Sequence, residues 1–163
     1  MDRTTTGIAI AAGLAFLWWK FFRPLTPSVT TSETYDTDVY LQGSTSYPEP
    51  IKRVARAIAA AEGYGIPGAI PTVAKNPGDL VLPGWAPTLG NAGIAVFDSA
   101  DLGWSKLYRQ LSIILSGGSS NYFPDTTIEE MGMKWANGDR NWAINVASNL
   151  GVATSTPLWQ VLA

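Results

Sequence analysis

The chain of 163 residues is long enough for one domain with its own hydrophobic core and an additional tail. Its 11 Lys and Arg and 13 Asp and Glu give a net charge of −2 without a basic block, which argues against a protein that binds nucleic-acid phosphates. The sequence contains no histidine and no cysteine, which excludes Ser/His/Asp and Cys/His catalysis, zinc sites and disulfides. The carboxylates do not have metal-site spacing, so we expect neither a metal nor another cofactor.

The first segment, residues 1–23, is dominated by an apolar run. Residues 7–19 carry no polar side chain, and Lys20 is then followed by two phenylalanines. This length fits a short membrane anchor whose Lys20 snorkels to the interface, the apolar core of a signal peptide, or a buried helix. Aromatic residues at the end of the run suit a membrane interface. We therefore predict a single-pass N-terminal transmembrane helix that contacts lipid through residues 7–22.

Residues 24–50 are rich in Ser, Thr and Pro and contain no Lys or Arg, which predicts a linker. Helical periodicity begins at Ile51, so the folded domain is predicted to be residues 51–163. The first expected helix covers 51–62 and ends at Gly63, and the second runs from a cap at Asp98 or Ser99 to Gly117. The capping box of Thr127 and Glu130 begins a third helix. A fourth covers about 141–150, and a short fifth begins at Pro157. Strand-like pieces at 79–82 and 93–97 indicate a small β element. The fold class is mainly α (α+β), with a small β or loop lobe after the first helix.

Glu62 is the strongest candidate for chemistry. It lies four residues after Ile58 and eight after Val54, so it continues the apolar face of the predicted helix. Burial and the negative end of the helix dipole both disfavour its charged form, which would raise its pKa and keep it protonated, as a general acid requires. The alternative is that Glu62 turns outward and is an ordinary polar residue at a helix end.

The surrounding motifs resemble the lysozyme-like domains of bacteria and their phages, a superfamily of lysozymes and lytic transglycosylases. The resemblance covers about residues 51–162. It rests on Ala-Glu-Gly at 61–63, Asn-Pro-Gly-Asp-Leu at 76–80, Gly-Ile-Ala-Val-Phe at 93–97 before a helix with Gly-Trp at 103–104, and the final Thr-Pro-Leu-Trp at 156–159. In that superfamily a helix ends at the catalytic Glu, a β or loop lobe follows, and further helices close the cleft.

The resemblance implies that Glu62 protonates the glycosidic oxygen between peptidoglycan sugars and that Asn76 and Asp79 lie in a turn facing it across the cleft. A hydrolase would use Asp79 as a second carboxylate. A lytic transglycosylase needs one acid/base, because the C6 hydroxyl of the sugar closes a 1,6-anhydro ring. Related domains often carry Asn at the position of Asp79, and a turn residue that bonds its own backbone is the alternative for it.

Three aromatic residues in predicted loops are candidates for stacking on sugar rings: Tyr64, Trp85 and Tyr122. Loop aromatics also cover hydrophobic cores, so a packing role is the alternative for each. Trp104, Trp135 and Trp142 fall on apolar helix faces and are expected in the core.

The leading hypothesis is a membrane-tethered enzyme that cleaves peptidoglycan glycan strands, a lytic transglycosylase rather than a hydrolase, in a bacterial envelope or phage virion membrane. The alternative is a structural protein of a phage virion or membrane complex, with virion or envelope partners and a lysozyme-like domain that binds glycan without turnover. Lys20 and Arg23 after the apolar run, against Arg3 before it, would leave the domain in the cytoplasm by the positive-inside rule. A virion membrane removes that conflict.

Overall fold

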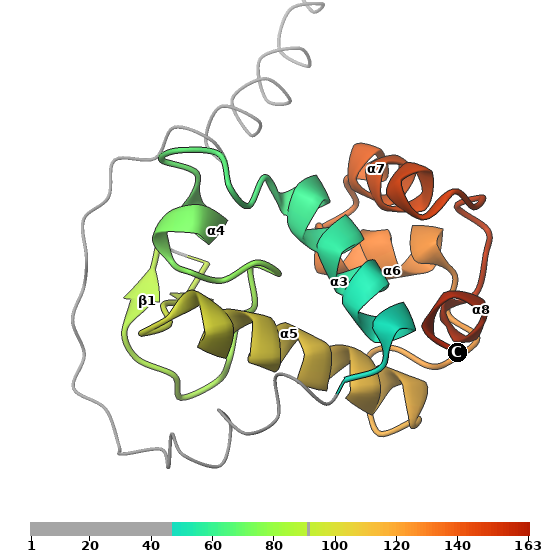
Figure 1. The fold of residues 1–163 in the computed structure, drawn as a ribbon, viewed down its shortest axis with the longest axis horizontal. Helices are drawn as coiled ribbons and strands as arrows, with labels where there is room; N and C mark the ends of the chain where they lie inside the picture. The colour runs from blue at the N-terminus through green and yellow to red at the C-terminus, as the bar shows by residue number, and fades with distance from the viewer. Residues whose placement is uncertain (1–46, 91) are drawn as a thin grey trace, which may run out of the picture.

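The computed structural model describes residues 47–90 and 92–163 (Figure 1). The predicted transmembrane helix over 1–23 and residues 24–46 of the predicted linker lie outside these residues. Among the helices that the structure does describe, none combines the length and apolar character needed to cross a membrane.

The described chain is mostly helical, as its sequence pattern predicts. A single antiparallel pair of two-residue strands is the sheet among the described residues. In chain order the elements are α3 (Glu49–Glu62), α4 (Ile70–Val73), β1 (Thr88–Leu89), β2 (Ile94–Ala95), α5 (Ala100–Leu115), α6 (Ile128–Trp135), α7 (Arg140–Leu150) and α8 (Leu158–Leu162).

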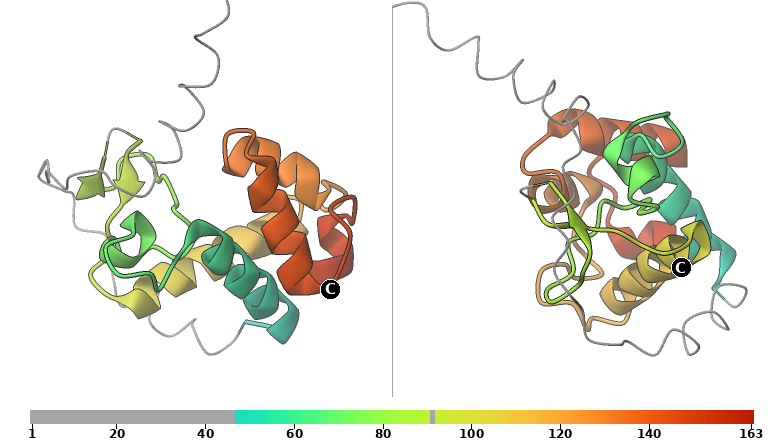
Figure 2. Two further views of the ribbon diagram at one scale, coloured as in Figure 1. Left: turned by 90° about the horizontal axis from the view of Figure 1, so that it is seen from above. Right: turned by 90° about the vertical axis from the view of Figure 1, so that its left-hand side faces the viewer.

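The helices α3 and α5 join two parts of the domain. Figures 1 and 2 show α4 and the strands at one end and α6, α7 and α8 at the other. Helix α3 packs against α5, α7 and α8, and α6 packs against α7. The main core lies between these helices, whereas a small second cluster of Ala95, Phe97 and Leu102 lies beside the strands. Leu82 packs against both clusters, so the two parts share a continuous apolar interior.

Local end signals place the helices close to where the sequence predicts them. Gly63 ends α3 in the left-handed conformation at φ 80°, and Gly151 ends α7 in the same way at φ 71°. Ser99, rather than Asp98, caps α5 by accepting from the Leu102 N–H. The predicted capping box of Thr127 and Glu130 opens α6.

The domain begins before Ile51. Helix α3 starts at Glu49, two residues earlier than expected, with Pro50 in its first turn, and the side chains of Glu49 and Arg56 form an exposed ion pair along its first two turns. The ring of Tyr47 packs on that of Tyr108, with centroids 5.4 Å apart. The last residues of the predicted linker are therefore part of the fold.

The segment between α3 and α5 differs from the prediction in detail. The piece at 79–82 forms no regular strand, but it does pair with β2: Val81 makes an isolated antiparallel bridge to Ile94, and the Ala95 N–H donates to the Leu80 carbonyl at 3.0 Å. The strand that pairs with β2 is Thr88–Leu89, with Thr88 opposite Ala95 and Leu89 opposite Ile94. The short helix α4 also lies in a stretch whose glycines and prolines predict only loops.

Candidate active site

Glu62 is the last residue of α3, and the backbone after it turns sharply. The Gly63 N–H donates to the Ala60 carbonyl at 3.1 Å, and the Tyr64 N–H donates to the Ala59 carbonyl at 2.9 Å. These two bonds are the Schellman pattern, which uses carbonyls that the helix end leaves without partners. The backbone position of Glu62 is thus set by a well-defined helix end.

The Glu62 side chain points inward, as its position on the apolar face predicts. The residue is 4% exposed. Its Oε1 accepts a hydrogen bond from the Trp142 indole Nε1–H at 2.8 Å, and Trp142 on α7 is itself 2% exposed. A carboxyl group in this environment loses most of its hydration, which disfavours the charged form, while the indole donor favours it.

An aromatic stack leads from Trp142 toward the loop before β1. The Trp142 and Trp135 rings are stacked with centroids 6.2 Å apart and planes 26° from parallel. The Trp135 Nε1–H in turn donates to the Gly78 carbonyl at 3.1 Å. Two tryptophans from α6 and α7 therefore connect Glu62 to the loop that carries Asp79.

A hollow of about 360 Å³ lies against this loop. Its polar lining includes Asp79 from the loop, Gln110 from α5 and Lys134 from α6, and two aromatic rings, Tyr122 and Trp135, form part of the wall. The Lys134 ammonium donates to the Asn121 carbonyl at 2.7 Å. The mixture of aromatic surface with amide, carboxylate and ammonium groups suits a neutral polar ligand with hydroxyl groups.

Asp79 adopts a backbone conformation that few residues tolerate. Its φ is 49°, in the left-handed region where Asp and Asn are favoured over other non-glycine residues. The Asp79 N–H donates to the Asn76 carbonyl at 3.1 Å and so closes the turn. Asp79 therefore serves as a turn residue and also lines the hollow.

Asn76, which is expected to bind substrate, has its side chain inside the protein. Asn76 is completely buried. Its Nδ2 group donates to the carbonyls of Leu80 and Ala95, both at 2.9 Å, and its Oδ1 accepts from the Leu80 N–H at 2.9 Å. Both amide hydrogens are used in bonds within the protein, so the side chain holds the loop to β2.

Of the three predicted stacking residues, only Tyr122 lines the hollow. It is buried, which raises the pKa of its hydroxyl and keeps that group a hydrogen-bond donor. Tyr64 instead packs edge-on against Trp104, with centroids 5.4 Å apart. Trp85 donates to the Val96 carbonyl at 3.0 Å, which ties its ring to the small second core.

The helical spacing of Trp135 and Trp142 predicts core positions for both and gives no sign that they lie at the site. Both are packed against other side chains, but each indole N–H also needs an acceptor when it is buried. The acceptors, the Gly78 carbonyl and Glu62, are far away in sequence. The one available signal was that a tryptophan on a buried helix face requires a polar partner.

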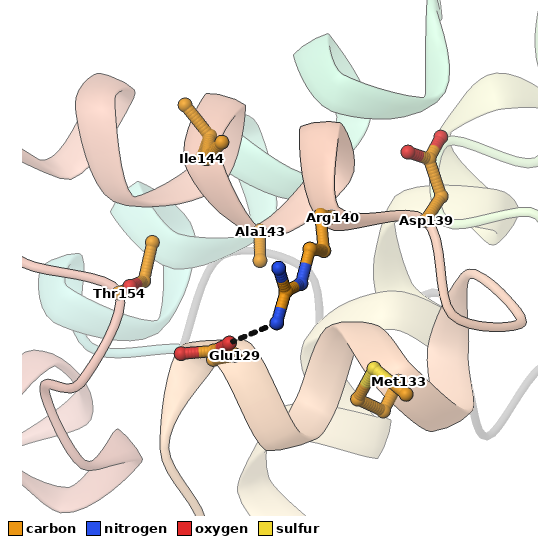
Figure 3. A pocket seen from close by; sticks show the side chains of 7 residues that line it. All are labelled: Glu129, Met133, Asp139, Arg140, Ala143, Ile144 and Thr154. Atoms are coloured by element: carbon orange, nitrogen blue, oxygen red, sulfur yellow. Dashed lines mark ion pairs between the residues drawn. The ribbon is translucent and has the colours of Figure 1, made fainter.

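A second hollow, of about 230 Å³, lies between α6 and α7 (Figure 3). In Figure 3 the Arg140 side chain points toward Glu129, and the two are 3.9 Å apart at their nearest charged atoms. Both side chains are exposed to solvent, and an ion pair of this kind contributes little. Met133 and Ile144 give the hollow an apolar rim. No residue that sequence reasoning singled out lies in it.

Within residues 47–90 and 92–163, no cluster of three or more carboxylates is placed to hold a metal ion. Comparison with known proteins gives no match to a family model, a curated protein or a solved structure. The geometry of the site is therefore the basis for assigning its chemistry.

Proposed function

We propose that this protein is a lytic transglycosylase of lysozyme-like type that cleaves the MurNAc–GlcNAc bond of peptidoglycan, with Glu62 as its acid/base. The observation that carries the proposal is the buried Glu62 carboxyl group at the end of α3, bonded to Trp142. Burial of an acid away from water is a common way for an enzyme to keep a proton donor at neutral pH.

The reaction requires one acid/base group. Glu62 gives its proton to the glycosidic oxygen as the bond from that oxygen to C1 breaks, and the bonding electrons stay with the oxygen. The Glu62 carboxylate then takes the proton of the C6 hydroxyl group while the C6 oxygen bonds to C1. The products are a 1,6-anhydro sugar and a new hydroxyl end, and no water is consumed. Glu62 returns to its starting protonation state.

The hollow beside the Asp79 loop supports binding of a saccharide. Sugars present apolar ring faces and many hydroxyl groups, and here aromatic rings and short polar groups line the same space. Tyr122 and Trp135 offer the aromatic surface, and Gln110 offers an amide. Asp79 would then orient a hydroxyl group of the sugar. If the reaction is a hydrolysis, Asp79 is the second carboxylate.

The proposal includes a membrane tether over residues 7–22 and a linker that lets the domain reach the wall of a bacterial envelope or act from a phage virion membrane. The length and composition of these segments support it.

A second candidate function is a structural protein of a virion or membrane complex whose domain binds glycan without turnover. The low exposure of Glu62 favours this structural function. In that case the hydrogen bond from Trp142 to Glu62 would have the sole role of holding α3 against α7.

The test is incubation of the full chain with purified cell-wall sacculi and mass spectrometry of the soluble products. Anhydro-muropeptides support the transglycosylase, reducing ends indicate a hydrolase, and binding without products indicates the structural protein. Glu62→Gln keeps an oxygen that can accept from Trp142 but removes the acidic proton. It should remain folded and lose at least about a hundredfold in rate.

Glu129→Gln is the matched control, because Glu129 is an exposed glutamate whose nearest cation is 3.9 Å away. It should retain the wild-type rate. If Glu62→Gln kept a third of that rate, Glu62 would not be the acid.

A further inference from the structure

The hydrogen bond between Trp142 and Glu62 distinguishes the two oxygens of the carboxyl group. An indole Nε1–H can only donate, so the oxygen that it contacts must accept. That oxygen is Oε1, at 2.8 Å. In a neutral carboxylic acid the carbonyl oxygen is the better acceptor, and the other oxygen carries the hydrogen.

We propose that Trp142 is a positioning residue that reserves Oε1 of Glu62 as an acceptor and thereby holds the carboxylic proton on Oε2. The role in proton delivery rests on the proposed function of Glu62 as the acid. The hydrogen-bond geometry itself does not depend on that function. Oε2 is then the atom that gives the proton to the leaving oxygen, and Oε1 stays bonded to the indole in both protonation states.

The indole is held so that it cannot turn away from Glu62. One face of Trp142 stacks on Trp135, whose own Nε1–H is fixed to the Gly78 carbonyl. On α6, Gly132 leaves room for this arrangement, since a β-carbon there would lie 3.1 Å from Cε3 of Trp142 and 3.1 Å from the β-carbon of Ala143. The orientation of the donor is therefore fixed by packing against α6.

The bond also affects how readily Glu62 ionises. A donor aimed at Oε1 is more favourable for the carboxylate than for the neutral acid, whereas burial opposes ionisation. The two effects act in opposite directions on one group. Removing the donor and keeping the ring should therefore make Glu62 harder to ionise.

Three elements pack against α3, and α8 among them carries no charged side chain. Helix α5 carries Asp101, Lys106 and Arg109, and Lys106 lies over the Trp85 ring. Helix α7 carries Arg140, which pairs with Glu129, and is preceded by Asp139, which accepts from the Asn141 N–H.

The first test is the titration of Glu62 followed by ¹³C NMR of the side-chain carboxyl carbons in the full chain. The sequence has five glutamates, and the Glu62 resonance is assigned by its loss in Glu62→Gln. In Trp142→Phe the titration midpoint should rise by about one pH unit. Trp85→Phe is the matched control, since it removes an indole donor that contacts the Val96 carbonyl beside the small second core instead. A midpoint that is unchanged in Trp142→Phe, or that shifts equally in both variants, overturns the proposal.

The second test uses the unaltered protein and decides the matter if Trp142→Phe does not fold. The Nε1–H resonance of Trp142 should shift with the same midpoint as the Glu62 carboxyl carbon, and that shift should vanish in Glu62→Gln. The same N–H should remain protected from exchange with solvent above and below the midpoint. Loss of protection when Glu62 is protonated would place the proton on Oε1 and overturn the proposal.

Neither measurement depends on catalysis. If the NMR results are as expected but Glu62→Gln still cleaves sacculi, the positioning role stands and the proposed function fails. If Glu62→Gln is inactive but the titration midpoint of Glu62 is the same in Trp142→Phe as in the unaltered protein, the proposed function stands and the positioning role fails.

Discussion

Gly103 of α5 lies so close to the Asp79 loop that a β-carbon built on it would be 1.9 Å from the carbonyl oxygen of Lys75. The same atom would be 3.0 Å from Cδ of Pro77. A backbone carbonyl cannot move aside as the tip of a flexible side chain can, so helix and loop would have to separate.

Gly103→Ala should therefore destabilise the domain by more than about 2 kcal/mol, although alanine is normally favoured over glycine inside a helix. Chemical denaturation measures the difference. Gly118→Ala is the control, because its β-carbon would meet Ile113 at an ordinary 3.5 Å, and we expect a change of no more than about 0.5 kcal/mol. Equal effects of the two changes would contradict the close approach of α5 to the loop.

Asn76→Asp should cost at least about 3 kcal/mol in the free energy of unfolding, because it replaces two buried donors with an oxygen that faces the Leu80 and Ala95 carbonyls. Asn145→Asp, on an exposed helical position, should change stability by no more than about 0.5 kcal/mol. Equilibrium denaturation at neutral pH compares them. A small loss in Asn76→Asp would mean that the loop is not held by this side chain.

Asp79→Asn separates the two possible reactions at Glu62. Asparagine tolerates the positive φ of 49°, so the turn should keep its shape. A transglycosylase should retain activity on sacculi within about tenfold, because its mechanism does not need the second carboxylate. A loss as severe as that of Glu62→Gln, together with reducing-end products, would assign the protein to the hydrolases.

Glu130→Gln should change how stability depends on pH. The Thr127 backbone N–H and hydroxyl donate to Glu130 and lower its pKa below the ordinary value of 4.5. The charged form thus stabilises the fold above the pKa of the unfolded chain, and this contribution is lost as pH falls through the folded pKa. Wild type and Glu130→Gln should differ most at neutral pH and converge near pH of about 3, as measured by denaturation. A difference that grows in acid would contradict the assignment.

Signals that act within a few residues made the helices predictable. Gly63 and Gly151 end helices, and Thr127 begins one, because each works through its own backbone or through bonds to the next turn. The inward direction of Glu62 followed from helical spacing alone. Helix α4 and strand β1 carry no such local pattern and depend on packing against distant parts of the chain.

The roles of Asn76 and Trp142 could not be derived in this way. The role of Asn76 depends on its bond to the Ala95 carbonyl, which is 19 residues away in sequence. The role of Trp142 depends on its bond to Glu62, which is 80 residues away. A buried amide and a ligand-binding amide look the same in sequence, and they differ only in what the fold brings next to them.

The hydrogen bond from the Trp135 indole to the Gly78 carbonyl joins two walls of the larger hollow, one on α6 and one on the loop. Since Asn76 ties the same loop to β2, hydrogen bonds hold these two walls of the hollow to each other and to β2. The proposed saccharide site would then be largely preorganised in this hollow. A ligand that fits it would lose its own freedom but would require little ordering of the protein. Selectivity there would come from complementarity to a fixed shape, in contrast to a site that closes by induced fit.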